Sequence, residues 1–394
     1  MISVEQARQL LFENPFTPEV GNSFLNVASG CFLAEDVRSK YDHPFFDNSA
    51  VDGYAIRFSD LHPHSNKLKL SGLIPAGETG KILETGKTSR IFTGAAVPEG
   101  ADTVIMQEFV TTENGFIHMN DPGLKPGSNV RKKGEQILAG QIVLNKGTQI
   151  TPPLIGFFAS IGIGKIPVFR FPKVHIIVTG DEFVIPGNDL SPGKIFESNG
   201  IMLQTAFASI GIAAKAEVVK DSEQGIADAI KIASAKNDLL ILTGGVSVGD
   251  YDFTRAALEA NAYSVCFHKI SQKPGKPLLF ARKENQFAFG LPGNPRAGMM
   301  AFYLYILPWL HLSFGSQHQG LPKISLPMAE KYSKKGTRAE FLTCKTENGN
   351  VQLLQKQDSH MLSSFGDADA IAWIPESKST VEKGEQVWVY ILPK

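Results

Sequence analysis

The sequence has few cysteines, no excess of either charge and no uninterrupted apolar segment of membrane-spanning length. The three cysteines, Cys31, Cys266 and Cys344, are far apart in the chain, so they predict neither a disulfide scaffold nor a cysteine-based zinc site. The 39 basic and 39 acidic residues balance each other, which argues against the basic surface of a nucleic-acid-binding protein. We therefore expect a protein of a reducing compartment, the cytoplasm, that does not bind nucleic acid.

The most apolar segment, residues 297–314, approaches the length of a membrane span. Pro308, His311 and two tyrosines interrupt it, and no basic residues follow it directly. Such a segment is more typical of a helix buried in a core or at a subunit interface. The first residues also lack the basic and apolar regions of a signal peptide. The sequence thus predicts no membrane association.

Two common nucleotide-binding motifs are also missing. The chain has no G-x-x-x-x-G-K-[ST] motif, which excludes a P-loop nucleoside triphosphatase, and no G-x-G-x-x-G follows a predicted strand. The sequence also gives no pattern that would indicate a catalytic Ser-His-Asp triad. Any anion site must therefore be built in another way.

With 394 residues, the chain is too long for one ordinary core. It opens with an amphipathic helix at about residues 3–11, and a β-rich stretch follows at about 47–143. A short helix is predicted near residues 151–163, and β-like segments fill the chain after residue 321. Several domains are therefore expected.

Between these regions, nearly all-apolar strands alternate with helices. This pattern predicts a doubly wound, mainly parallel sheet that is covered by helices on both faces. The predicted strands are residues 174–178, 215–219, 239–243, 263–270 and 287–291. In such sheets ligands bind beyond the carboxyl ends of the strands.

Glycines and lysines follow the predicted strands and favour an anion site at this edge. Glycines let backbone N–H groups approach an anion closely, and lysines add full positive charges. Each feature alone is more often a structural turn, but together at one edge they favour a ligand. The candidate binding residues are Gly244, Gly245, Ser247, Gly249, Lys269, Lys273, Lys276, Pro292 and Asn294.

Carboxylates also follow these strands, at Glu182, Asp221, Asp250 and Asp252. Carboxylates beside phosphates repel them unless a divalent cation lies between, and Mg²⁺ is bound by one or two carboxylates plus substrate phosphate. These four residues are therefore candidate Mg²⁺ ligands. The alternative is that Asp221 and Asp252 only cap the helices that follow them.

The motifs GGVSVGDYD (244–252), KPGKP (273–277) and GLPGNP (290–295) together resemble those of the MoeA family of molybdopterin molybdenumtransferases, which is related to the C-terminal domain of gephyrin. The resemblance continues through DNSAVDGYA (47–55), FTGAAVPEGADTVIMQE (92–108), PGSNVRKKGE (126–135) and TGDE (179–182), in the same order. It covers nearly the whole chain.

The resemblance implies a multidomain α/β fold with four domains. The corresponding boundaries are a discontinuous helical and extended linker domain at 1–45 and 139–172, a β-rich domain at 46–138, an α/β molybdopterin-binding domain at 173–318 and a C-terminal β-barrel at 319–394. The implied activity is molybdenum cofactor biosynthesis, in which molybdenum from molybdate is inserted into adenylylated molybdopterin and AMP is released, with Mg²⁺ as cofactor. A homodimer, with a molybdopterin adenylyltransferase as a further partner, is also implied.

The resemblance also assigns roles to individual residues. Asp52 and Thr93 in the β-rich domain, together with Glu182 and Asp252, would be catalytic. Arg338 and Ser359 would bind substrate from the C-terminal domain. The family's second and fourth domains argue against a third possibility, a pterin adenylyltransferase, which needs only the α/β domain.

Three positions depart from the family pattern: Gln136 and Glu197 replace aspartates, and Arg296 replaces a small apolar residue. Glu197 keeps its charge, whereas Gln136 loses a carboxylate. A non-catalytic pterin-nucleotide-binding or scaffold homologue is therefore the alternative to an active transferase.

Overall fold

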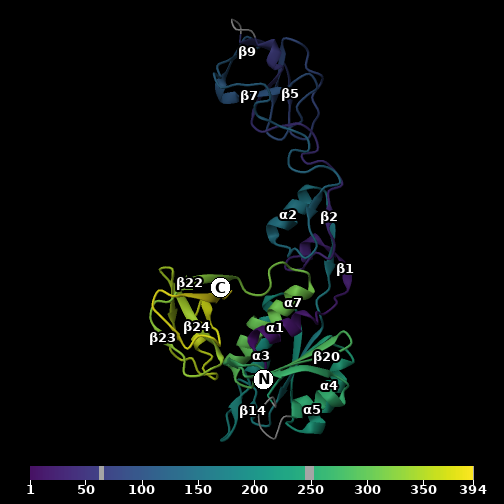
Figure 1. Cartoon of the computed structure of the whole chain (residues 1–394). Coiled ribbons are helices and arrows are strands. Elements are labelled where there is room, and N and C mark those ends of the chain that lie inside the picture. Colours follow the sequence, from purple (N-terminus) through teal and green to yellow (C-terminus); the bar gives the residue numbers. More distant parts are fainter. Residues whose placement is uncertain (62–65, 245–252, 394) are drawn as a thin grey trace. The chain divides into compact units, whose positions relative to one another are not determined.

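The computed structural model describes residues 1–61, 66–244 and 253–393 and divides into two compact units (Figure 1). Unit 1 comprises Met1–Glu35, Lys146–Pro152 and Lys165–Lys394, and unit 2 comprises Asp36–Asn145 and Pro153–Gly164. The chain therefore passes between the two units four times. The predicted four-domain boundaries are finer than this division and stay a prediction.

Unit 1 is built around a six-stranded sheet. Its strand order is β16 (Ala214–Val219), β13 (Val174–Thr179), β17 (Leu239–Thr243), β21 (Gln286–Leu291), β20 (Pro277–Lys283) and β18 (Ser264–Lys269). The first four strands pair in parallel, as predicted. β20 is antiparallel to both of its neighbours, so the sheet is mixed.

The sequence reasoning missed β20 because its hairpin with β21 turns without glycine. Lys283 pairs with Gln286, which leaves Glu284 and Asn285 as the turn, and Glu284 has a φ of 54°. Tight hairpins normally place glycine or asparagine in this left-handed region. Since β18 is antiparallel to β20, it runs in the same direction as the other four strands. The carboxyl ends of five strands therefore lie at one edge, the rim.

Helices cover both faces of the sheet, which confirms the doubly wound prediction. Ile176 and Val178 face a large buried cluster with α3 (Asn199–Ser209), whereas Ile177 faces a second cluster with α4 (Glu223–Ser234) and α5 (Phe253–Ala260). The most apolar segment forms α6 (Pro295–Ala301), a π-helical turn (Phe302–Ile306) and α7 (Leu307–Ser313), all in the large cluster. It is thus a buried helix of its own unit. No helix in the described ranges is long and apolar enough to cross a membrane.

The N-terminal helix α1 (Val4–Phe12) also belongs to this core. Its Val4, Ala7 and Leu11 side chains are buried in the large cluster. The backbone N–H of Ile2 donates to the Lys269 carbonyl at 3.0 Å, so the chain start is attached to the end of β18. Beside the core, β1 (Val20–Phe24) pairs with β12 (Lys165–Phe169), and β14 (Phe183–Val184) pairs with β15 (Ile195–Phe196).

The C-terminal strands, yellow in Figure 1, form a second sheet in unit 1. Its order is β19 (Gln272–Lys273), β24 (Ala339–Glu347), β26 (Ala370–Ile374), β28 (Gln386–Ile391) and β22 (Lys323–Pro327), and β25 (Asn350–Leu353) also pairs with β24. The short β23 (Tyr332–Ser333) and β27 (Thr380–Val381) pair separately, and α8 spans Ser364–Asp367. Because β19 comes from the α/β domain, Lys273 lies where the two sheets meet. Closure into a barrel stays a prediction.

Unit 2 contains the predicted β-rich region. Its sheet order is β7 (Thr103–Met106), β4 (Gly53–Ile56), β6 (Lys87–Ile91), β5 (Lys67–Ile74), β9 (Phe116–Met119) and β8 (Val110–Glu113). A 3₁₀ turn at Gln107–Phe109 separates β7 from β8. Two short pairs, β2 (Val37–Arg38) with β11 (Ile142–Leu144) and β3 (Asn48–Ser49) with β10 (Val130–Arg131), and most of α2 (Pro152–Ser160) complete the unit.

Candidate anion-binding site

A cavity of about 390 Å³ opens at the rim of unit 1, where the two sheets meet. It is lined by the loop that carries two lysines, by the turn before α6 and by a segment of the C-terminal region. Six of the predicted binding residues line it: Lys273, Lys276, Pro292, Asn294, Arg338 and Ser359. Lys269 ends β18 at the same rim but is not among the described residues that line the cavity.

The lysine loop is held by a buried amide. Gln272 is fully buried, and its Nε2 donates to the carbonyls of Pro274 and Gly275 at 3.1 and 3.2 Å. Tyr305, also fully buried, donates its hydroxyl to Gln272 Oε1. These bonds fix the backbone between Lys273 and Lys276. Sequence reasoning missed both polar residues, because one glutamine or tyrosine between apolar residues carries no recognisable pattern.

The C-terminal region contributes two side chains that were predicted from the resemblance. Arg338 donates from Nη1 to the Gln272 carbonyl at 3.1 Å, which leaves its other donors available to a ligand. Asn294 donates from Nδ2 to Ser359 Oγ at 2.7 Å. The structure thus brings these residues together with the lysines, and their roles stay predictions.

The strand ends beside the cavity are tied closely together. Gly244 has a φ of 87°, and a Cβ there would lie 2.2 Å from the Thr179 carbonyl, so only glycine fits. Asn199 donates from Nδ2 to the Gly293 carbonyl at 2.7 Å and to Thr243 Oγ1 at 3.1 Å. The predicted binding residues Gly245, Ser247 and Gly249 and the predicted metal ligands Asp250 and Asp252 lie outside the described residues.

Asp221 lies close to two other carboxylates. Burial raises its pKa, and repulsion from Glu182 and then Asp181 raises it further. It does not cap α4, because Ser222 is the N-cap and its Oγ accepts from the Gly225 N–H at 3.2 Å; the capping alternative is wrong for Asp221. In the described ranges, no three His, Cys, Asp or Glu side chains are grouped to hold a metal ion.

Glu197, the longer acid at a family aspartate position, is buried and structural. Its Oε1 accepts from the Gly200 N–H at 2.7 Å in the first turn of α3. Acceptors at this place satisfy the free N–H groups of a helix start. The extra methylene therefore still allows the carboxylate to reach the helix.

In unit 2, the predicted pair Asp52 and Thr93 is in contact. The Thr93 N–H and hydroxyl both donate to Asp52 Oδ1 at 2.8 Å. These two bonds, with a smaller contribution from Arg90, lower the pKa of Asp52. Asp52 is thus held as a carboxylate, and its second oxygen accepts no hydrogen bond from the residues that the structure describes.

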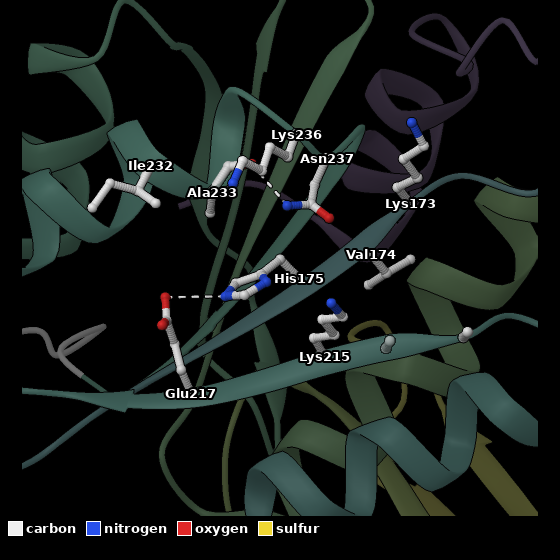
Figure 2. A pocket seen from close by; sticks show the side chains of 11 residues that line it. Lys173, Val174, His175, Lys215, Glu217, Ile232, Ala233, Lys236 and Asn237 are labelled. Atoms are coloured by element: carbon white, nitrogen blue, oxygen red, sulfur yellow. Dashed lines mark hydrogen bonds and ion pairs between the residues drawn. The ribbon is translucent and has the colours of Figure 1, made fainter.

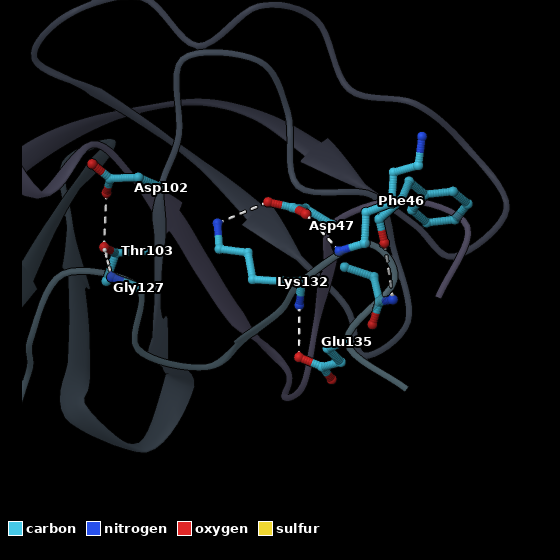
Figure 3. Close-up of polar contacts among 9 residues, drawn as sticks. Phe46, Asp47, Asp102, Thr103, Gly127, Lys132 and Glu135 are labelled. Atoms are coloured by element: carbon cyan, nitrogen blue, oxygen red, sulfur yellow. Dashed lines mark hydrogen bonds and ion pairs between the residues drawn. The ribbon is translucent and has the colours of Figure 1, made fainter. Parts of the chain in front are cut away.

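Gln136 lines a cavity of about 650 Å³ in unit 2, with Arg131 and Gly94. Figure 3 shows how the preceding segment is fixed: Lys132 contacts Asp47 through its ammonium group and Glu135 through its backbone N–H, at 2.8 and 2.9 Å. Burial raises the pKa of Asp47, but bonds from Lys132 and Lys133 outweigh it and lower the pKa. The carboxylate of Glu135, next to Gln136 in the chain, thus accepts a hydrogen bond from the backbone of its own loop.

A further cavity, of about 460 Å³, lies at the opposite edge of the main sheet (Figure 2). His175 Nε2 lies 3.0 Å from Glu217 Oε1 there, and Figure 2 shows the ammonium groups of Lys173 and Lys215 separated rather than converging. Ligands of open α/β sheets bind at the carboxyl ends of strands. We therefore take the rim as the candidate functional site.

Comparisons with known proteins agree over the whole chain. Residues 2–162 match the MoeA N-terminal region (domain I and II), residues 175–312 a probable molybdopterin binding domain, and residues 325–392 the MoeA C-terminal region (domain IV). A molybdopterin molybdenumtransferase of Haemophilus influenzae is 36% identical over 99% of this chain and 98% of its own, and one of Bacillus subtilis is 32% identical over 92% and 87%. A molybdopterin biosynthesis MoeA crystal structure from Pyrococcus horikoshii, 30% identical, superimposes with a TM-score of 0.85 over 100% of both chains.

Proposed function

Because the chain belongs to the MoeA family, we propose that it is a molybdopterin molybdenumtransferase of molybdenum cofactor biosynthesis. It binds adenylylated molybdopterin and molybdate, the pterin–AMP linkage is cleaved, and molybdenum is inserted as AMP leaves. The curated relatives carry this enzyme name over nearly their full length, which favours a transferase over a non-catalytic homologue.

The cavity at the rim carries this proposal. Lys273, Lys276 and Arg338 give three cationic side chains to one cavity, which suits the phosphates of a pterin nucleotide. Lysine acts as a point charge, and the arginine fork can bind two phosphate oxygens at once. Asn294 and Ser359 add neutral hydrogen-bonding groups beside the charges.

The carboxylates support Mg²⁺ as cofactor. Burial raises the pKa of Asp221, and repulsion from Glu182 and Asp181 raises it further. A cation between Asp221 and Glu182 would relieve this repulsion, and the phosphates of the ligand would complete its oxygen ligands. Asp250 and Asp252 are the other proposed ligands from the sequence. When bound, Mg²⁺ would neutralise charge on the phosphates of the linkage.

The family resemblance supports further proposals. The chain acts as a homodimer, and it accepts its substrate from a molybdopterin adenylyltransferase. Its few, widely spaced cysteines support a place in the cytoplasm. In unit 2, the carboxylate of Asp52, held ionised by Thr93, takes part in the reaction.

The direct test is to incubate the purified protein with adenylylated molybdopterin, Mg²⁺ and low molybdate, and to measure AMP release and active cofactor. We expect both. Binding without AMP release would favour the non-catalytic homologue, and no binding would contradict the proposed function.

Lys276→Ala tests the cavity itself. Loss of one of three cations should weaken nucleotide binding at least tenfold in calorimetry, about 1.4 kcal/mol, with the thermal midpoint little changed. Lys283→Ala is the matched control, because Lys276 directly precedes β20, Lys283 ends the same strand, and Lys283 is not among the described residues that line the cavity. Equal affinity of both variants and the wild type would remove Lys276 from the site.

A further inference from the structure

Arg296 is a charged side chain with no access to solvent. Its relative exposure is 0%, and burial lowers its pKa to about 10, although the charge of Asp358 opposes this shift. The guanidinium therefore remains charged at neutral pH. A buried charge is costly unless its donors are satisfied, so the position of its acceptors must be well defined.

The acceptors of Arg296 come from the C-terminal region. Nη1 donates to the Gln357 carbonyl at 2.6 Å, and Nη2 donates to Gln357 Oε1 at 2.5 Å. Nε donates to Ser364 Oγ at 3.2 Å. Arg296 lies on α6, so these bonds join the α/β domain to the segment that contains residues 357–364.

Gln357 is in turn attached to the C-terminal sheet. Its Nε2 donates to the carbonyls of Thr343 and Leu354 at 2.8 and 2.7 Å, and its Oε1 also accepts from the Thr343 N–H at 3.1 Å. Arg296 thus binds a residue whose amide group is already fixed on β24. The contact therefore joins a helix, α6, to an amide group that is held by hydrogen bonds to the C-terminal region.

A second hydrogen bond joins the same two segments, between the residue two before Arg296 and the residue two after Gln357. Asn294 donates to Ser359 Oγ at 2.7 Å, and both residues line the cavity, as do Asp358 and His360. Arg296 itself is not among the lining residues. A ligand in the cavity would therefore meet the Asn294–Ser359 bond, whereas neither Arg296 nor Gln357 is among the described residues that line the cavity.

We propose that Arg296 is a positioning residue, which holds the segment 357–360 so that Ser359 meets Asn294 and the ligand at the cavity wall. This inference rests on the proposed function of the cavity as a pterin-nucleotide site. The other side of the cavity, the lysine loop, is held independently by Gln272. Loss of Arg296 therefore displaces the Ser359 wall and leaves Lys273 and Lys276 in place.

The test is a double-mutant cycle between Arg296→Met and Ser359→Ala, read as the Kd for adenylylated molybdopterin by calorimetry. Methionine fills a similar space without donors, so the fold should persist. We expect each single variant to weaken binding about fivefold or more and the double variant to be no weaker than Arg296→Met, because the two residues act as one unit. Additive losses, or wild-type affinity in Arg296→Met, would overturn the inference.

Val389→Ala is the control for a general loss of stability. Val389 is fully buried in the C-terminal cluster and is not part of the Arg296 contacts. Its truncation should lower the thermal midpoint without changing the Kd. If Arg296→Met does not fold, Ser364→Ala takes its place in the cycle. It removes the acceptor of Nε and the bond from Ser364 Oγ to the Met361 carbonyl, and it leaves both bonds to Gln357.

Hydrogen exchange of the ligand-free protein separates this inference from the proposed function. In Arg296→Met, amides of residues 357–364 should exchange faster, while those of the lysine loop stay as in the wild type. Unchanged exchange overturns the inference whether or not a ligand binds. Failure of the wild-type protein to bind the nucleotide, with faster exchange in the variant, contradicts the proposed function alone.

Discussion

Asp52 is kept ionised mainly by one neighbour, Thr93, with a smaller contribution from Arg90, so its pKa is a sensitive measure of the unit 2 site. The Thr93 N–H and then the Thr93 hydroxyl lower this pKa. Thr93→Val removes only the hydroxyl donor, so the Asp52 pKa should rise part of the way toward its ordinary value, whereas Thr93→Ser should leave it low. Carboxyl-carbon NMR titration measures both.

The sign of the stability effect follows from this lowered pKa. Because the folded-state pKa of Asp52 is below the unfolded value, its stabilising contribution is present above the unfolded pKa and is lost as the pH falls through the folded pKa. In Thr93→Val that loss should begin at a higher pH. An unchanged Asp52 pKa would show that the hydroxyl contributes nothing.

A substitution at Gln136 tests whether the neutral amide at this position raises the molybdate concentration that the protein needs. It lines the unit 2 cavity beside Arg131, where the resemblance expects a carboxylate. We expect Gln136→Asp to lower the molybdate concentration for half-maximal cofactor formation, and the exposed Gln319→Asp to leave it unchanged. An equal requirement in Gln136→Asp and the wild type would make this position peripheral.

At the scale of elements, α1 depends on its N-cap residue, Ser3. Ser3 Oγ accepts from the Gln6 N–H at 3.1 Å, and Gln6 Oε1 accepts from the Ser3 N–H at 2.9 Å, a reciprocal capping box. Ser3→Ala should lower the free energy of unfolding by about 1 kcal/mol, measured by denaturant titration. Ser3→Asp should largely preserve it, and equal losses in both variants would mean that the cap is not the cause.

The elements that could be predicted from the sequence are those with strong periodicity. The apolar parallel strands and their helices were found, and with them the edge at which Lys276 and Asn294 lie. β20 was missed because Glu284 occupies a turn position that glycine usually marks. The supports behind the cavity could not be inferred, since whether Gln272 is buried or exposed depends on packing from distant parts of the chain.

For the whole molecule, the apolar segment of α6 and α7 no longer argues for a dimer, because its own unit buries it. Unit 1 does expose Val20, Phe24 and Val27 at 52%, 58% and 67%, close together in the chain. We expect light scattering at micromolar concentration to give twice the mass of one chain. Phe24→Glu should weaken this dimer, whereas Val218→Glu, an exposed valine on β16, should not.

A monomeric wild-type mass would contradict the proposed homodimer. A dimer that tolerates Phe24→Glu would place the interface elsewhere on the molecule.

The four passages of the chain between the two units have a consequence for proteolysis. A single cut at any one junction leaves the units covalently joined by the remaining three connections. A cut after residue 35 would also leave the N-terminal fragment in place, because α1 is buried in the large cluster and β1 pairs with β12. Protein cut at one junction should therefore elute as one species in size-exclusion chromatography under native conditions. It should separate into two fragments only in denaturant.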